Sequence, residues 1–293
     1  MQSREALGLI LGLIAVVVFG ATLPMTRLAV GDLGPWFLTL ARASGAGLIA
    51  VTVLLSLRRK PPRRQFGQLF LAAVLLVGGF PGLTGVAMQS VPAAHGGIVV
   101  GVLPLATIVA AALIDGERPS AGFWGCGIAG AALVVAFAVR HGTGPVAAGD
   151  LLLILAVACA AAGYTISGRL SRTMPGWEVI SWTLVITLPV TLPATILLWP
   201  GPDRQVAASS WAALAYLAAM SMYLGFVAWN AGMALGGIAR VSQVQLLQTF
   251  VTLAIAALIL SERFDAETIG FALAVVAIVF LGRKFRIAPH GSK

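Results

Sequence analysis

Long apolar segments, separated by short polar connections, constrain the fold of this chain more than any other feature of its sequence. An α-helix needs about 20 mostly apolar residues to cross the hydrocarbon core of a bilayer, and the apolar segments have about this length. Of the 293 residues, 59% are hydrophobic and 10% are charged, whereas soluble domains contain about 25% charged residues. A soluble globule of this composition would have too few polar side chains to cover its surface.

We therefore expect an all-α membrane protein with ten transmembrane helices. The first apolar segment follows Arg4 and could be read as a signal peptide, but it is too long for that and lacks an evident cleavage site. The two cysteines, Cys126 and Cys159, fall inside apolar segments and are interpreted as small core residues rather than as a disulfide. The ten helices are expected at about residues 7–29, 35–57, 67–89, 93–114, 121–139, 150–170, 178–199, 210–233, 238–260 and 267–284.

The net charge of +9 reflects basic residues in the short connections between helices. This distribution is typical of topology signals at a membrane surface and gives no reason to expect nucleic acid as a partner. If the N-terminus lies in the cytoplasm, fourteen Lys and Arg residues lie inside and three lie outside. The bias predicts a multi-pass protein of the bacterial inner (plasma) membrane with both termini cytoplasmic.

A repeat divides the chain into residues 1–145 and 146–293. Met88, the run 111–114 and Glu117-Arg118 recur 145 residues later as Met233, the run 256–259 and Glu262-Arg263. Each repeat contains five expected helices, an odd number, so the second must enter the membrane from the opposite side. Inverted repeats recur in secondary transporters, where one half rocks against the other around a site near the midplane. A duplication without that function is the alternative.

At these residues the sequence resembles the EamA-type members of the drug/metabolite transporter superfamily. The resemblance spans almost the whole chain and implies two inverted five-helix repeats around a central cavity. It also implies a transporter of small solutes, and in finer detail the chain is similar to the YddG-type exporters of aromatic amino acids. One departure is Thr249, which stands where the repeat would place a counterpart of Pro104. The motifs that carry the resemblance are 19–22 with Arg27, Arg42, Leu103-Pro104, 116–119, 125–130 and 261–264.

The positions of the acidic residues restrict the transport mechanism. All ten fall in expected loops or at helix ends, whereas a carboxylate near the midplane is the usual mark of a proton relay or cation site. This argues against a cation/proton antiporter driven by a buried glutamate. His95 lies near the end of an expected helix, where a surface or capping role is the simpler interpretation. Arg42 lies within an expected helix, and we expect it to reach outward to the interface or to pair with Asp32.

Uncharged polar residues are the better candidates for a binding site. Within 238–260, Ser242, Gln245, Thr249 and Thr252 lie on one helical face with Gln248 beside it. Amides can bind both the amine and the carboxylate of a zwitterion, although hydrogen bonds between helices would explain them as well. Aromatic and thioether side chains on other helices would form an adaptable wall for planar rings, or simply pack. The predicted substrate-binding residues are Phe19, Thr22, Phe80, Thr84, Met88, Tyr164, Ser167, Tyr223, Phe226, Asn230, Gln245, Gln248 and Thr249.

The sequence thus predicts a secondary transporter that exports neutral or zwitterionic organic solutes, aromatic amino acids among them, by alternating access. A proton-coupled exporter of drugs or organic cations is the first alternative, and a channel or receptor is the second. An enzyme is not expected, because the sequence offers no nucleophile–base set and no metal-spaced cluster of His and Glu. We expect no metal and no cofactor, a small-molecule substrate, membrane lipid as a partner, and a monomer.

Overall fold

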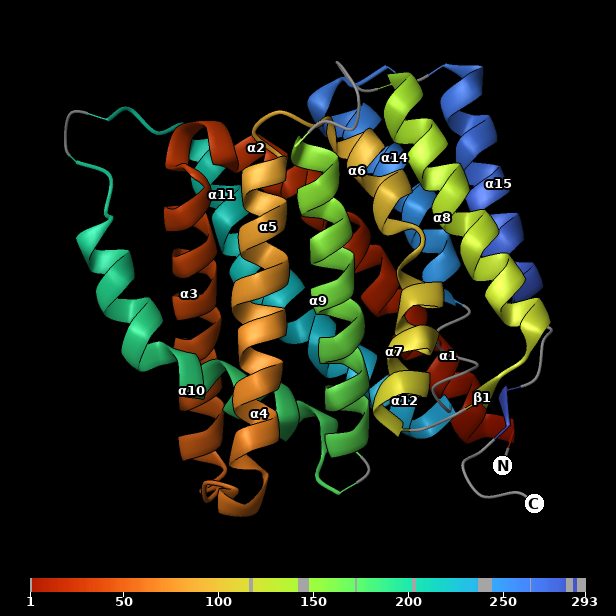
Figure 1. Cartoon of the computed structure of the whole chain (residues 1–293). Coiled ribbons are helices and arrows are strands. Elements are labelled where there is room, and N and C mark those ends of the chain that lie inside the picture. The colour runs from red at the N-terminus through yellow and green to blue at the C-terminus, as the bar shows by residue number, and fades with distance from the viewer. Residues whose placement is uncertain are drawn as a thin grey trace.

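The computed structural model describes residues 2–115, 118–141, 148–171, 173–201, 204–236, 244–263, 265–282 and 287–288. Its helices stand side by side as a bundle, and both termini lie at the same end (Figure 1). In the described part of the chain, the strands are two residues long: β1 (Arg118–Pro119) pairs antiparallel with β2 (Ile287–Ala288).

Five of the ten expected helices are continuous. Two of them begin next to prolines. The first turn of a helix tolerates proline, because the N–H groups of that turn have no partner within the helix. Gly34, with φ of 73°, precedes the N-terminal Pro35 of one helix, and Pro175 caps the start of another. The continuous helices are α3 (Pro35–Ser56), α8 (Ala121–His141), α9 (Ala148–Leu170), α10 (Gly176–Leu197) and α15 (Ala266–Gly282).

The other five expected helices are interrupted. The expected helix 7–29 consists of α1 (Gln2–Gly20) and α2 (Thr22–Leu33), and 93–114 consists of α6 (Ala93–Val100) and α7 (Leu103–Asp115). Each of two others contains a π-helix: 67–89 has η1 (Arg63–Gln65), α4 (Phe66–Ala73), the π-helix η2 (Val74–Gly79) and α5 (Phe80–Ala87), and 210–233 has α11 (Ala208–Tyr216), the π-helix η3 (Leu217–Leu224) and α12 (Gly225–Gly236). The described part of 238–260 has η4 (Gln245–Leu247) and α14 (Gln248–Leu260). The expected start of the last of these, 238–243, lies outside the described residues.

Prolines account for two of these interruptions. A proline has no N–H group, so it removes the hydrogen bond to the carbonyl four residues earlier. Pro24 therefore cannot donate to the Gly20 carbonyl, and Thr252 Oγ1 of α14 donates to that oxygen instead at 2.8 Å. Pro104 leaves the Val100 carbonyl without its helical donor in the same way, next to the break between α6 and α7.

The interruptions follow the sequence repeat. The α7 and α14 helices begin at Leu103 and Gln248, 145 residues apart. The π-helices, residues 74–79 and 217–224, also lie at nearly equivalent positions of the two halves. Figure 1 shows β1 at the end that holds the termini and the α14–α15 connection at the opposite end. Repeat-related segments thus run in opposite directions through the bundle.

Seven helical segments of the described chain are long and apolar enough to cross a membrane, by length and composition. Two shorter apolar helices, Gln248–Leu260 and Ala266–Ile278, accompany them. The protein is therefore an all-helical, multi-pass membrane protein, and the count of ten spans stays a prediction. The seven are Ala6–Leu33, Pro35–Ser56, Arg63–Ala87, Ala93–Ile114, Ala148–Leu170, Gly176–Leu197 and Ala208–Leu235.

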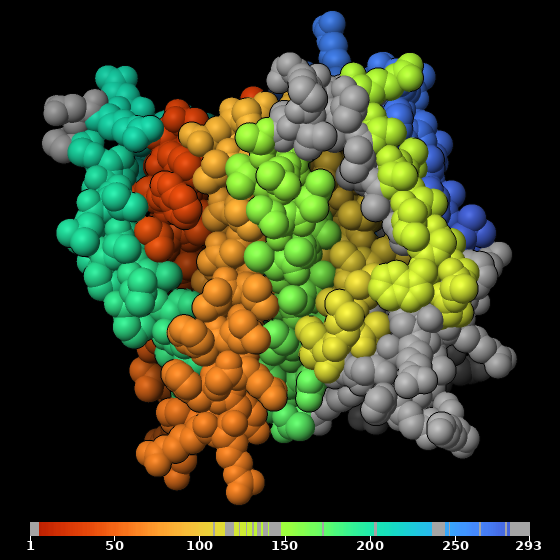
Figure 2. Space-filling model, viewed as in Figure 1, coloured from red at the N-terminus to blue at the C-terminus, as the bar shows by residue number. Residues whose placement is uncertain are grey.

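Large apolar side chains cover the outside of the bundle as well as its core. Leu197 is 84% exposed and Leu258 is 82% exposed, as expected for side chains that face lipid. Inside, Leu38 and Trp229 are almost completely buried. The space-filling view shows α4, α5 and α9 as one continuous wall (Figure 2), so side chains fill the gaps between these ribbons on this face.

Candidate functional site

The central pocket lies between the two halves of the chain. Its residues come from both repeats. Six of the predicted binding residues are among them: Phe19, Thr22, Phe80, Tyr164, Phe226 and Gln248. The complete lining is Phe19, Thr22, Leu23, Arg42, Leu76, Phe80, Pro81, Val100, Leu103, Tyr164, Ser221, Met222, Phe226 and Gln248.

One side of the central pocket is an aromatic cluster. The rings of Phe19 and Phe226 meet edge to face with their centroids 5.1 Å apart, and Tyr164 lies 5.8 Å from Phe226 in a similar arrangement. Trp229 backs the cluster, 6.2 Å from Phe19 and 6.1 Å from Tyr164. Edge-to-face rings of this kind offer both faces and edges to an added ring, so the wall suits a planar apolar group.

Other residues of the same pocket are polar. The hydroxyl groups of Thr22 and Ser221 share a hydrogen bond of 2.8 Å. The Arg42 guanidinium donates from Nη2 to Ser221 Oγ at 3.4 Å. Arg42 is only 3% exposed, and its Nε–H has no hydrogen-bond partner among the described residues. A fixed positive charge therefore lies inside the bundle, at the wall of the pocket.

This placement contradicts the expectation that Arg42 reaches the interface or pairs with Asp32. Asp32 instead accepts hydrogen bonds from Ser210 Oγ at 2.6 Å and from the Ala207 N–H at 3.2 Å. Both expectations for Arg42 are thus wrong. The packing of α3 places Arg42 against Ser221 of η3, and the Asp32 carboxylate is hydrogen-bonded to Ser210 of α11 instead. The spacing of a single helix does not show which neighbour it faces.

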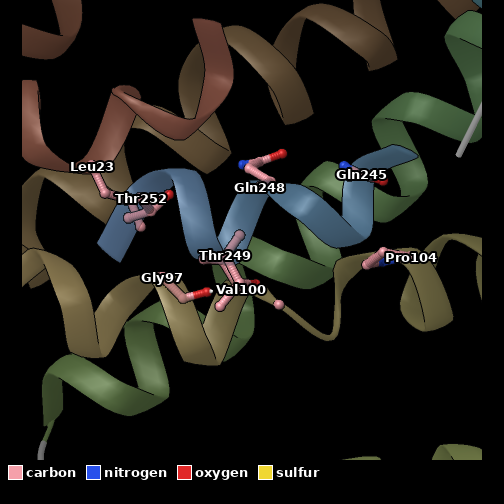
Figure 3. Close-up of a pocket in the computed structure, with 9 residues that line it drawn as sticks. Leu23, Gly97, Val100, Pro104, Gln245, Gln248, Thr249 and Thr252 are labelled. Carbon is pink, nitrogen blue, oxygen red and sulfur yellow. Dashed lines mark hydrogen bonds between the residues drawn. The ribbon is translucent and has the colours of Figure 1, made fainter. Parts of the chain in front are cut away.

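A second hollow, the amide pocket, adjoins the central pocket and shares Leu23, Val100 and Gln248 with it. Figure 3 shows Thr249 pointing toward Gly97 and Val100, while Gln248 points to the other side of the same helix. Gln245 Nε2 and Gln248 Oε1 have no hydrogen-bond partner among the described residues. The amide pocket is lined by Leu23, Gly97, Val100, Gly101, Pro104, Gln245, Gln248, Thr249 and Thr252.

Close packing of α14 against α6 accounts for the shape of the amide pocket. A Cβ atom at Gly97 would lie 2.7 Å from Thr252 Cγ2, and one at Gly101 would lie 2.8 Å from Thr249 Oγ1. Neither position has room for a side chain. The Thr249 hydroxyl donates to the Gly97 carbonyl at 3.5 Å, so this threonine both holds α6 and lines the pocket.

Both hollows are narrow in this conformation. The space open to water-sized molecules is about 20 Å³ in the central pocket and about 10 Å³ in the amide pocket. One water needs roughly 10–15 Å³ on this measure. An amino acid would therefore enter only after the helices around the pocket move apart.

Five predicted binding residues lie outside both hollows. The Thr84 hydroxyl donates to the Phe80 carbonyl of its own helix at 2.8 Å. The hydroxyls of Tyr223 and Ser181 share a hydrogen bond of 3.1 Å, and Asn230 Nδ2 donates to the Gly176 carbonyl at 3.0 Å. In this conformation the side chains of Tyr223 and Asn230 therefore join helices. The residues outside are Thr84, Met88, Ser167, Tyr223 and Asn230.

Ser221 and Arg42 are the polar residues of the central pocket that the sequence analysis did not select as binding residues. Ser221 lies within the π-helix η3, two residues before the predicted Tyr223. The wider turn of a π-helix changes which side chains share a face, and the sequence carries no clear signal for it. For Arg42, the signal was present, because a charged residue within a span marks a functional site by default.

The end opposite the termini carries two further contacts between the halves. His95 is buried, and its Nε2 lies 2.7 Å from Oδ1 of the buried Asp150. The expected surface role of His95 is thus wrong. Both oxygens of the Glu262 carboxylate accept hydrogen bonds at 2.9 Å from the first two N–H groups of α6, those of Ala93 and Ala94.

The described residues contain no group of three or more His, Cys, Asp or Glu side chains that could hold a metal ion. Arg42 and Gln248 are instead the groups that could bind a polar solute, since they have donors and acceptors that no protein group uses.

Comparison with known proteins places these features in context. The sequence matches the EamA-like transporter family twice, over residues 6–140 and 147–283. It is 41% identical over 285 residues to the "Uncharacterized transporter YdeK" of Bacillus subtilis (strain 168), covering 97% of this chain and 99% of that protein. A solved crystal structure with 19% sequence identity superposes with a TM-score of 0.64 over 94% of this chain and 96% of the other. The last similarity concerns the fold alone.

Proposed function

This chain belongs to the EamA-like transporter family, and from that premise we propose that it moves small neutral or zwitterionic organic solutes, aromatic amino acids among them, out of the cytoplasm. The observation that carries this proposal is the division of the central pocket. An aromatic cluster of Phe19, Tyr164 and Phe226 shares the pocket with the hydroxyls of Thr22 and Ser221. Such a pocket suits a solute with a planar apolar body and a polar end.

Alternating access is the mechanism that we propose. We propose two inverted five-helix repeats, residues 1–145 and 146–293. This arrangement fits the two family matches and the helix interruptions at related positions of the repeats. It also fits the location of β1 and of the α14–α15 connection at opposite ends of the bundle (Figure 1). The pocket lies between these halves and is almost closed. Rocking of the halves would open it to one side of the membrane at a time.

The proposal extends to the setting of the protein. We propose a monomer in the bacterial inner membrane with both termini in the cytoplasm, in contact with membrane lipid. Metal and cofactor are not required, because the solute is moved without being changed chemically. Thr84, Met88, Ser167, Tyr223 and Asn230 stay proposed binding residues for a conformation in which the pocket is open.

An exporter of organic cations coupled to protons is the second candidate. It would require a pocket that stabilises positive charge, whereas the central pocket contains Arg42 and no carboxylate. A channel would pass solute far faster than a carrier, and a receptor would bind solute without moving it. No observation on the pocket favours either of these.

Uptake into proteoliposomes tests the proposal. The purified protein would be reconstituted into vesicles that are loaded with one amino acid. Entry of labelled phenylalanine, tryptophan, leucine and tetraphenylphosphonium into these vesicles would be followed with and without a pH gradient. We expect exchange of the aromatic amino acids, with little effect of pH. Entry of the cation alone, driven only by a proton gradient, would show that the proposed substrate class is wrong.

A variant of the aromatic cluster makes the test specific. Phe226→Ala should lower uptake of phenylalanine about three- to tenfold relative to leucine, because an aromatic pair contributes about 0.5–1.5 kcal/mol beyond area burial. Phe70→Ala is the matched control, since Phe70 is 53% exposed on the outside of the bundle and is not a pocket residue. Equal effects of the two variants on both substrates would contradict the proposed wall.

A further inference from the structure

Among the described residues that line the central pocket, Arg42 is the one with a cationic side chain. It lies in α3 within the candidate membrane span Pro35–Ser56. Its exposed fraction is 3%, and its Nη2 donates a hydrogen bond of 3.4 Å to Ser221 Oγ. Its Nε–H has no partner among the described residues.

No carboxylate of the described chain neutralises this charge. The ion pairs found there join Arg59 to Glu178, His95 to Asp150 and Arg140 to Glu267, and none of them involves Arg42. Asp32, its expected partner, is instead bound to Ser210 and Ala207.

Such an arrangement is unfavourable in the protein alone. A guanidinium stays charged under all ordinary conditions and presents five N–H donors in a planar fork. A charge within a membrane span is stable when it meets water, a counter-ion or backbone carbonyls. Arg42 has one long hydrogen bond to a neutral hydroxyl, and its Nε–H is left without a partner among the described residues at the wall of the pocket.

A carboxylate is the group that fits this fork best, because its two oxygens accept two parallel N–H bonds. The surroundings complete a site for a carboxylate-bearing solute. The hydroxyls of Thr22 and Ser221 can donate to the same group, and the unpartnered Oε1 of Gln248 can accept from an amine. The aromatic cluster lies beside them, where the apolar part of such a solute would pack.

We propose that Arg42 binds the carboxylate of the transported solute, so that the protein selects zwitterions and organic carboxylates and rejects organic cations of the same shape. This inference rests on the proposed function, because it assigns the charge of the substrate to the same pocket. It goes beyond that function in naming the required chemical group and the residue that recognises it.

Substrate pairs that differ only in the carboxylate provide the test. Phenylalanine and 3-phenylpropionate carry it, phenylalaninamide and phenethylamine lack it, and leucine with leucinamide repeats the comparison on an aliphatic body. In proteoliposomes of the full chain, we expect the carboxylates to enter at least about tenfold faster than the matched cations. Arg42→Gln should abolish that preference, since the loss of one charge-assisted hydrogen bond corresponds to about a tenfold effect or more.

Arg42→Lys should restore part of the preference, because lysine keeps the charge but lacks the planar fork. Arg204→Gln is the matched control, because Arg204 lies in a connection, is not among the residues that line the pocket, and donates to the Gly31 carbonyl at 3.5 Å. A second measurement needs no variant: carboxylates, and not their amides, should raise the thermal unfolding temperature of the wild-type protein.

The outcomes separate the two proposals. If amides and amines enter wild-type vesicles as fast as the acids, or if folded Arg42→Gln keeps the preference for acids, the role of Arg42 is refuted while transport stands. If leucine enters faster than leucinamide but phenylalanine does not enter, the aromatic substrate is refuted and the role of Arg42 stands. If no probe enters and none protects the protein, both proposals fail.

Discussion

Loss of the Glu262 carboxylate is expected to loosen the contact between the α14–α15 connection and the start of α6. Glu262 accepts the N–H groups of Ala93 and Ala94, each at 2.9 Å, across 169 and 168 residues of chain. The first N–H groups of a helix have no partner within the helix. A carboxylate there satisfies two of them and also meets the positive end of the helix dipole.

The size of the effect follows from this geometry. A hydrogen bond to a charged group contributes about 1.5–3 kcal/mol, and the dipole adds about 0.3–1 kcal/mol. Glu262 is partly exposed, so water replaces part of what is lost and the low end applies. Glu262→Gln keeps one acceptor oxygen but loses the charge. We therefore expect a loss of about 1.5 kcal/mol, which is about a tenfold change in a local opening equilibrium.

Hydrogen–deuterium exchange of the peptide that contains α6 would measure this opening. The amides of residues 93–100 should exchange about tenfold faster in Glu262→Gln than in the wild-type protein. Glu267→Gln is the matched control, because Glu267 pairs with Arg140 on the exposed side of the same region, where an ion pair contributes little. Equal exchange in α6 for wild type and Glu262→Gln would refute the reasoning.

Two further predictions concern packing and a buried pair. Gly97→Ala should destabilise the protein by about 1–3 kcal/mol, because the new methyl group would lie 2.7 Å from Thr252 Cγ2. In the control variant Gly125→Ala the methyl group meets nothing within 4 Å, so this variant should unfold at or above the wild-type temperature. Equal melting temperatures of the two variants would contradict the close approach of α6 and α14. Asp150→Ala should lower the free energy of unfolding by about 2 kcal/mol, because it removes the buried hydrogen-bond acceptor of His95. Asp150→Asn should lower it less. A melting curve of the alanine variant equal to that of the wild type would exclude a stabilising pair of His95 and Asp150.

The apolar pattern predicted the helices well where local sequence determines them. The expected helix at 35–57 is α3 (Pro35–Ser56), and its start is fixed by Gly34 and Pro35. The expected polar face began at Ser242, which lies outside the described residues. Its other members, Gln245, Thr249 and Thr252, share one pocket, because a helical period shows which side chains share a side. Gln245, Gln248 and Thr249 all line the amide pocket.

Contacts between distant helices could not be predicted in the same way. Whether Arg42 faces lipid, Asp32 or a pocket depends on how α3 packs against η3, which no local pattern encodes. The π-helices are a second example, because an extra residue per turn leaves no mark in an apolar composition. Tyr223 and Asn230 are a third example: their residue types suit a binding site, while in this conformation their partners Ser181 and Gly176 lie on α10.

The matched interruptions of the two halves have an energetic consequence. A continuous helix is a stiff rod, whereas the α6–α7 break and the 3₁₀-helix η4 before α14 interrupt the regular α-helical hydrogen bonding at corresponding places of the two repeats. Each repeat has a helix interruption at a corresponding place in its sequence. The fold should therefore open toward either side of the membrane with similar ease. We therefore expect forward and reverse fluxes of comparable intrinsic rate, with the net flow of solute set by its concentrations on the two sides of the membrane.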